Sequence, residues 1–248
     1  MLHKKNLLAI LILLISLDLV YSFFQHAGKP LDGDLPGGIL PAEDVRPVLN
    51  DPLGISVITE GKTYPNPNRF FSHASFYAYF NSVPFALQSF IDPVSSIYYS
   101  SAIFKTFVQL ILILLISLII GSQQNLCLLF SPFRGDVRLL RTEGWIIISV
   151  FLIFPFFQTN GFQSEIGIID SSITYTFFYA YPLIFLLLYF KPLFAFLLHD
   201  KEMNNSYAAN LSRIILAFPV CLSGPLNPGI VLIISLLLFL NYLYDYLE

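Results

Sequence analysis

Residues 93–120 read PVSSIYYSSAIFKTFVQLILILLISLII, an apolar run long enough to cross a lipid bilayer as one helix. Asp92 directly precedes Pro93. This pair is typical of a helix start, because the aspartate side chain accepts a hydrogen bond from a free amide and proline has no amide hydrogen to leave unpaired. The run therefore predicts a membrane-spanning helix that begins at Pro93.

The composition of the whole chain agrees with this prediction. Hydrophobic residues make up 56% of the chain and charged residues 12%, and the mean hydropathy is +0.70. Soluble proteins carry roughly 25% charged residues, so the composition indicates an integral membrane protein. The net charge of -3 is dispersed and excludes the clustered basic face that nucleic-acid binding needs.

The two cysteines, Cys127 and Cys221, lie in or beside apolar runs, which predicts a packing role without a disulfide framework or a metal motif.

Five further apolar runs predict a polytopic all-α protein with about six transmembrane helices, in a single membrane domain over residues 1–248. The additional runs cover residues 7–24, 145–157, 173–190, 211–222 and 229–244. The first run is either an uncleaved anchor or a cleavable signal peptide, and Asp18 with the aromatics that follow it favours the anchor. The last two runs are either two spans or a re-entrant pair, since SGPLNPG interrupts them at residues 223–229. Asn227 directly before Pro228 is the same kind of helix-start signal as Asp92 before Pro93, and it predicts the start of the last helix.

Basic residues predict the orientation, because they concentrate on the cytoplasmic side of membrane proteins. Eight of the thirteen lie in segments that this topology assigns to the cytoplasm: Lys4, Lys5, Arg134, Arg138, Arg141, Lys191, Lys201 and Arg213. The N-terminus is therefore expected in the cytoplasm, and the large loop over residues 25–92 is expected outside the cell membrane.

Two parts of the loop differ in composition. Residues 26–54 read HAGKPLDGDLPGGILPAEDVRPVLNDPLG, in which glycines and prolines argue against a long helix, so we expect an irregular segment. Residues 69–90 read RFFSHASFYAYFNSVPFALQSF, and aromatic residues of this kind prefer the membrane interface. An interfacial helix is therefore expected over about residues 70–90.

Carboxylates in the irregular segment are the candidates for chemistry. Asp32 and Asp34 flank a glycine, and Glu43 and Asp44 form a second pair. Such groups act as general bases or hold a divalent cation against a diphosphate, although the spacing matches no specific metal motif. The alternatives are structural: the first two aspartates suit a tight turn, and the second pair suits solvation or pairing with Arg46.

The order of these features resembles the N-terminal part of the GT-C superfamily of polytopic glycosyltransferases. The resemblance covers about residues 1–120: one helix, a large outer loop with an early acidic motif, and an aromatic surface helix before the second span. It implies sugar transfer from a polyprenyl-phosphate carrier, with Asp32 or Asp34 as the base. It also implies that Arg46 or Arg69 neutralises the carrier phosphate, since arginine binds phosphate bidentately.

In that family some members carry an acidic residue in a later outer loop, to which Glu165 or Asp170 would correspond. Asp170 also suits the N-cap of the following helix. The DGD triplet and NPNRFF, at residues 66–71, are in addition similar to uncharacterised membrane proteins of gliding-type bacteria, a likeness that implies no activity.

Three functional hypotheses follow. The first is a glycosyltransferase-like enzyme that acts on a lipid-linked substrate at the outer leaflet. The second is a noncatalytic subunit or assembly partner that binds another membrane protein. The third is a transporter, which ranks lowest because the sequence has no convincing internal repeat. In all three the partners are membrane lipids or membrane proteins, and nucleic acid is not expected.

Overall fold

The computed structural model describes residues 4–41, 43, 45–63, 69–121, 150–151, 168–199 and 206–247. Every regular element in these ranges is a helix, which confirms the predicted all-α fold class. Three helical segments are long and apolar enough to cross a membrane, and they support the assignment as a membrane protein. The segments are Pro93–Ile119, Ile173–Phe196 and Leu226–Leu247.

The three segments correspond to predicted spans, with different bounds. Helix α7 covers Pro93–Gly121 and α13 covers Leu226–Leu247. The middle segment is continuous but not uniform, since α10 (Ile173–Tyr175) leads through a π-helical turn, η3 (Thr176–Ala180), into α11 (Tyr181–His199).

The other predicted spans are less complete. Helix α1 (Lys4–Ala27) has 24 residues and includes the first run. Helix α12 (Tyr207–Cys221) has 15 residues, fewer than a bilayer needs. The predicted span over residues 145–157 lies outside the described residues except for residues 150–151. A count of six spans therefore stays a prediction.

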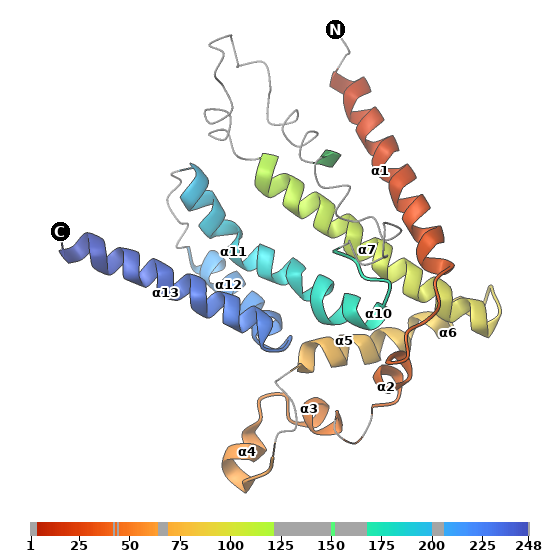
Figure 1. Cartoon of the computed structure of the whole chain (residues 1–248), viewed down its shortest axis with the longest axis horizontal. Coiled ribbons are helices and arrows are strands. Elements are labelled where there is room, and N and C mark those ends of the chain that lie inside the picture. Colours follow the sequence, from red (N-terminus) through yellow and green to blue (C-terminus); the bar gives the residue numbers. More distant parts are fainter. Residues whose placement is uncertain are drawn as a thin grey trace.

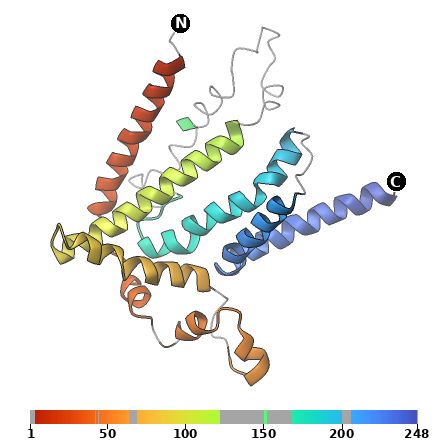
Figure 2. The same ribbon diagram turned by 180° about the vertical axis from the view of Figure 1, so that it is seen from behind.

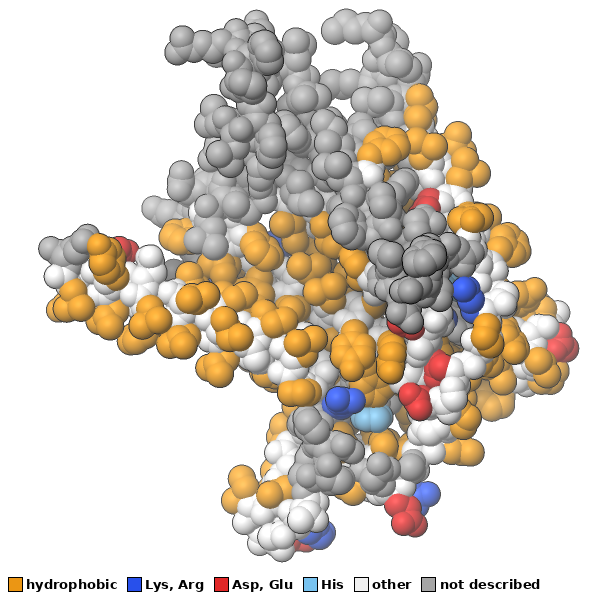
Figure 3. Space-filling view, viewed as in Figure 1, with side chains coloured by type: hydrophobic (Ala, Val, Ile, Leu, Met, Phe, Trp, Pro, Cys, Tyr) orange, Lys and Arg blue, Asp and Glu red, His pale blue; other side chains and the backbone are white. Residues whose placement is uncertain are grey.

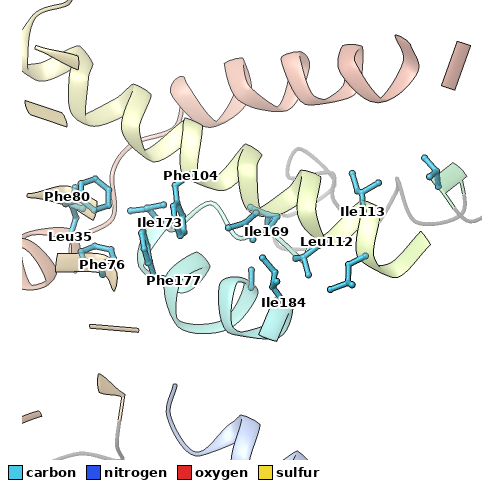
Figure 4. Close-up of a cluster of buried hydrophobic side chains, with 14 residues drawn as sticks. Leu35, Phe76, Phe80, Phe104, Leu112, Ile113, Ile169, Ile173, Phe177 and Ile184 are labelled. Carbon is cyan, nitrogen blue, oxygen red and sulfur yellow. The ribbon is translucent and has the colours of Figure 1, made fainter. Parts of the chain in front are cut away.

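The long helices pack around α7. This helix lies between α1 and α11, and α12 packs on the other side of α11 (Figures 1 and 2). The aromatic rings of Phe104 in α7 and Phe177 in η3 are stacked, with centroids 3.7 Å apart and an interplanar angle of 9°. Figure 4 shows these two rings beside Ile173, with Leu112 and Ile184 further along the same interface. The core is thus formed where α7, η3 and α11 meet.

The predicted interfacial helix is divided into two shorter helices. Helix α5 covers Phe70–Phe80 and α6 covers Val83–Leu87. Pro84 explains why a new helix starts here, because it lies in the first turn of α6, where the missing amide hydrogen leaves no helical hydrogen bond unmade. Helix α5 crosses the ends of α7 and α10 (Figure 1), and it buries Phe76 and Phe80 against Phe177. Its apolar face therefore belongs to the protein core.

The segment predicted to be irregular contains two short helices, and a third follows it directly. They are α2 (Leu35–Ile39), α3 (Arg46–Asn50) and α4 (Ile55–Glu60), and they lie on the side of α5 away from the long helices (Figures 1 and 2). The Asp51 carboxylate caps the last of them, since it accepts hydrogen bonds from the amides of Ile55 at 2.9 Å and Ser56 at 2.8 Å. Frequent glycine and proline keep each helix to a turn or two.

The predicted helix starts can be compared residue by residue. Asp92 caps α7 as expected, because its Oδ1 accepts a hydrogen bond from the Ser95 amide at 2.9 Å. Asn227 does not cap α13, which begins one residue earlier at Leu226. The N-cap of α10 is Ser172, whose hydroxyl accepts from the Tyr175 amide at 3.1 Å. Asp170 instead accepts from the Ser172 amide at 2.6 Å, so it shapes the turn before the cap.

Candidate functional site

A pocket of about 370 Å³ lies where α2, α5 and η3 meet, and we call it the Arg69 pocket. Three of its lining residues carry polar groups suited to chemistry: Asp34, Arg69 and His73. Two tyrosines, Tyr175 and Tyr179, line it as well, and each is about half exposed. Figure 3 shows basic, acidic and histidine side chains close together below the apolar surface of the long helices. The pocket therefore joins polar side chains from the loop to the end of the helical core.

Arg69 is held in place by three parts of the chain. It is the N-cap residue of α5, and its guanidinium carbon lies 5.7 Å from the ring centroid of Phe178. Its aliphatic stem packs on Gly224, where an added Cβ would lie 3.2 Å from Arg69 Cγ. The Phe71 amide donates to the Leu222 carbonyl at 2.8 Å, which ties the start of α5 to the same turn. This turn is the SGPLNPG segment that the sequence identified as a break.

The same arginine also lines a smaller pocket of about 220 Å³. That pocket includes Ser223 from the turn between α12 and α13, and Asn227 from the first turn of α13. Arg69 therefore stands between two cavities, one facing the loop and one facing the last helix. A guanidinium in such a position can reach a planar or tetrahedral oxyanion in either cavity.

His73 lies one helical turn after Arg69 on α5. Its ring makes an edge-to-face contact with Phe178, with centroids 4.7 Å apart. Arg69 and His73 therefore contact the same aromatic ring and form one face of the pocket.

The two aspartates of the DGD triplet have different surroundings. Asp32 accepts hydrogen bonds from Ser172 Oγ at 2.9 Å and from Thr174 Oγ1 at 2.8 Å, and a longer one from the Thr174 amide at 3.2 Å. It also accepts one from the Asp34 amide at 3.2 Å, as in a tight turn. Burial raises the pKa of Asp32, but the hydrogen bonds from Thr174 and Ser172 outweigh it, and the pKa lies below its usual 3.8. Asp32 therefore fixes the start of α10, whereas the Asp34 side chain is exposed and lines the pocket.

Sequence reasoning missed Lys105, which lies behind the pocket. It belongs to α7, is 2% exposed, and donates a hydrogen bond from Nζ to the Ser171 carbonyl. It also interacts electrostatically with Asp32 and Asp170. A signal was present, because a lysine inside an apolar run is costly in a membrane unless it is paired. The buried ammonium holds the segment before α10 against α7.

The remaining candidates lie elsewhere. Glu43 is exposed, and Asp44 and Glu165 lie outside the described residues. Arg46 lines a second pocket of about 700 Å³ with Phe70 and Tyr77, on the neighbouring face of α5. Its Nε donates to the Pro41 carbonyl at 3.3 Å. The structure therefore brings together Asp34 and Arg69, and it places Arg46 apart from them.

A divalent cation would need several oxygen or nitrogen ligands. Within the described ranges, no group of three or more histidine, cysteine, aspartate or glutamate side chains could hold a metal ion. Asp34 is the one carboxylate that lines the Arg69 pocket among these residues. A cation there would depend on oxygens supplied by a substrate such as a diphosphate.

Comparison with known proteins gives no relative from which a function could be transferred. No family model, no curated protein and no solved structure matches the chain.

Proposed function

We propose that the protein binds the phosphate group of a lipid-linked substrate in the Arg69 pocket, at the outer surface of the membrane, and acts as a glycosyltransferase-like enzyme. The observation that carries the proposal is the convergence of Asp34, Arg69 and His73 in one pocket at the end of the membrane helices. An acid, a guanidinium and an imidazole at that depth suit a substrate whose reactive group lies among the lipid headgroups.

Each polar group has a role in this reaction. Arg69 binds the carrier phosphate with two parallel N–H donors, which neutralises the negative charge. Asp34 takes the proton from the acceptor hydroxyl while the acceptor oxygen forms a bond to the sugar anomeric carbon. The bond from that carbon to the phosphate oxygen breaks, and the carrier phosphate leaves with the electron pair. His73 can protonate or hydrogen-bond the departing phosphate oxygen, since imidazole titrates near neutral pH.

The tyrosines at the pocket support a location at the membrane surface. Tyr175 and Tyr179 are each about half exposed, and tyrosine side chains prefer the boundary between lipid and water. The predicted cytoplasmic location of most basic residues supports a pocket on the outer side. A lipid carrier could then enter laterally while its phosphate remains at the level of Arg69.

Ligand-dependent stabilisation tests the binding step. The purified protein in detergent is heated with polyprenyl phosphate or with the matching polyprenol, which has the same chain without phosphate. The phosphate form should raise the melting temperature, and a ligand at 100 times its Kd stabilises by about 2.7 kcal/mol. Arg69→Gln should lose the difference between the two lipids, whereas Arg213→Gln on α12, outside the pocket, should keep it. Equal stabilisation of wild type by both lipids would contradict the proposal.

The catalytic step has its own test. Asp34→Asn should keep the phosphate-dependent stabilisation and lose transfer of a labelled sugar from polyprenyl phosphate to an acceptor. Retained transfer in this variant would exclude Asp34 as the base. Loss of both stabilisation and transfer would assign Asp34 to binding.

A noncatalytic membrane subunit is the second candidate, and the surface of α13 favours it. Only 6% of the most apolar window of this helix is buried in the chain, and Leu232, Ile233 and Leu237 are at least 60% exposed. Such a surface suits lipid or a helix of another membrane protein. This candidate predicts that a stable partner co-purifies in mild detergent and that the double substitution Leu232→Ala with Leu237→Ala on this surface releases it. Unchanged recovery of the protein as a single species in mild detergent would contradict it.

A further inference from the structure

Helices α1 and α7 meet through polar side chains that recur every four residues. They are Asp18, Ser22 and His26 on α1, and Ser101, Lys105 and Gln109 on α7. Residues four apart lie on one face of a helix, so each set forms a stripe, and the two stripes face each other. We call this interface the polar seam. It lies within helices whose other residues are mostly apolar.

Two hydrogen bonds define the deep end of the seam. Gln109 Nε2 donates to Asp18 Oδ2 at 3.0 Å and to Ser22 Oγ at 3.1 Å. Asp18 is nine residues before the end of α1 at Ala27. At 1.5 Å per residue this carboxylate lies about 13 Å below that end of the helix. A carboxylate at such a depth in a membrane helix is costly and usually marks a functional site.

The shallow end of the seam reaches the candidate site. Lys105 interacts electrostatically with His26 in the seam and with Asp32 and Asp170 beyond it. Asp32 in turn accepts hydrogen bonds from Thr174, which lines the Arg69 pocket. The seam therefore connects the depth of Asp18 to the side of the membrane on which the pocket lies, here called the pocket side.

Several polar atoms in the seam are buried without a partner. His26 is 2% exposed, Ser101 is 1% exposed and Gln109 is fully buried. Both ring nitrogens of His26, the Ser101 hydroxyl and Gln109 Oε1 have no hydrogen-bond partner among the described residues. Buried polar atoms in this state are rare in folded proteins, and each calls for an explanation. A hydrogen-bonding role that changes during function supplies one.

We infer that Asp18 is a proton-binding site inside the membrane and that the polar seam lets it exchange protons with the pocket side. The carboxylate takes up a proton to become a neutral acid, the form that a low dielectric favours. His26 accepts a proton on one ring nitrogen and releases one from the other. The Ser22 hydroxyl likewise accepts one proton and releases another. Both groups therefore end in the protonation state in which they began. Gln109 orients the carboxyl group. This inference does not depend on the ligand of the Arg69 pocket.

Charged side chains lie at the pocket end of the seam. Among the described residues, His26 faces Lys105 from α7 and Lys29 from the segment after α1. Asp32 and Asp170 lie beyond Lys105. Past Gln109, Leu112 and Ile113 on α7 are fully buried and apolar, and Ser117 is the next buried polar side chain on that helix, two turns away. Within the described ranges, the hydrogen-bonded part of the seam thus ends at Gln109 and continues toward the pocket side.

Carbodiimide labelling in liposomes tests the inference, because dicyclohexylcarbodiimide reacts with protonated carboxyl groups in apolar surroundings. The chain carries Cys127→Ser, Cys221→Ser and Lys62→Cys, and a membrane-impermeant biotin maleimide selects copies whose pocket side faces outward. The inner and outer pH are set separately, and mass spectrometry measures the labelled fraction of Asp18. Labelling should increase when the outer solution is acidified and should not respond to the inner pH. Asp18→Asn should lose the label at this position.

Variants of the seam separate proton access from a structural role. His26→Phe and Gln109→Leu should lose the response to outer pH, whereas Ser117→Ala, at another buried serine of α7, should keep it. Size-exclusion chromatography in detergent first checks that each variant elutes at the same volume as the wild type. If His26→Phe fails to fold, Gln109→Leu alone tests the inference. Three results would overturn the inference: no label on Asp18 at any pH, labelling that follows the inner pH, or folded seam variants that respond as wild type does.

Discussion

Asp32 and Asp34 are two residues apart, yet their carboxylates face different surroundings. Asp32 accepts hydrogen bonds from Ser172 and Thr174 across 140 residues of chain, whereas Asp34 lines the Arg69 pocket. Hydrogen bonds to a charged group contribute about 1.5 to 3 kcal/mol each when they are removed singly. The geometry therefore favours a structural role for the first aspartate and leaves the second for chemistry.

Paired substitutions test this division. Asp32→Asn should lower the free energy of unfolding by about 1 to 3 kcal/mol, because a neutral amide replaces a charge-assisted acceptor. Asp34→Asn should leave it almost unchanged, since an exposed side chain contributes little. Thermal or denaturant unfolding in detergent measures both. Equal losses of stability in the two variants would show that the aspartates are not divided in this way.

The same aspartate predicts a dependence on pH. Its pKa in the folded protein lies below 3.8, so its stabilising effect is complete above that value and is lost as the pH falls through the lower, folded-state pKa. The melting temperature of wild type should therefore fall more steeply in this acidic range than that of Asp32→Asn. Parallel curves for the two proteins would contradict the assignment.

At the scale of elements, α2 can approach α5 only because residue 38 is a glycine. An added Cβ at Gly38 would lie 1.8 Å from Phe76 Cε1, and Phe76 is 1% exposed. Gly38→Ala should therefore destabilise the protein by about 1 to 3 kcal/mol and weaken ligand binding in the Arg69 pocket, which both residues line. Gly37→Ala is the matched control, because nothing lies within 4 Å of its added Cβ. Similar melting temperatures for the two variants would show that α2 can shift without cost.

Helix α7 has a packed face and an exposed face, and phenylalanine occurs on both. Phe104 stacks on Phe177 and is 7% exposed, whereas Phe107 is 50% exposed. Phe104→Ala should cost about 3 kcal/mol or more, because it leaves a cavity where α7 meets η3. Phe107→Ala should cost much less. Unfolding of the two variants in the same detergent distinguishes them, and comparable losses would place the core elsewhere.

At the scale of the whole molecule, the orientation in the membrane is the property that most affects function. In a chain with Cys127→Ser and Cys221→Ser, a cysteine at position 62 should react with an impermeant maleimide in intact cells. A cysteine at position 206 should react only after the membrane is permeabilised. Lys62 and Ser206 are both exposed, so access to the reagent and not burial decides the result. The reverse pattern would place the Arg69 pocket in the cytoplasm.

The sequence by itself determined the class of the protein and the start of its central helix. An apolar run of roughly 20 residues or more has few alternatives to a helix in a membrane, and Asp92 before Pro93 is a local signal that needs no distant partner. Local physics was sufficient for both. Composition also pointed to the carboxylates of the outer segment, Asp32 and Asp34 among them, whereas Arg69 entered, beside Arg46, only through the resemblance to polytopic glycosyltransferases.

Only the tertiary structure decided how these candidates are grouped. Nothing in the sequence near Asp32 indicates that Thr174 will donate hydrogen bonds to its carboxylate. Nothing near Arg46 indicates that it will line a different pocket from Arg69. Lys105 contacts Ser171, which is 66 positions away in the sequence. Gln109 contacts Asp18, which is 91 positions away. Such pairings depend on the packing of α1, α5, α7 and α10, and that packing is set by the shapes of many side chains at once.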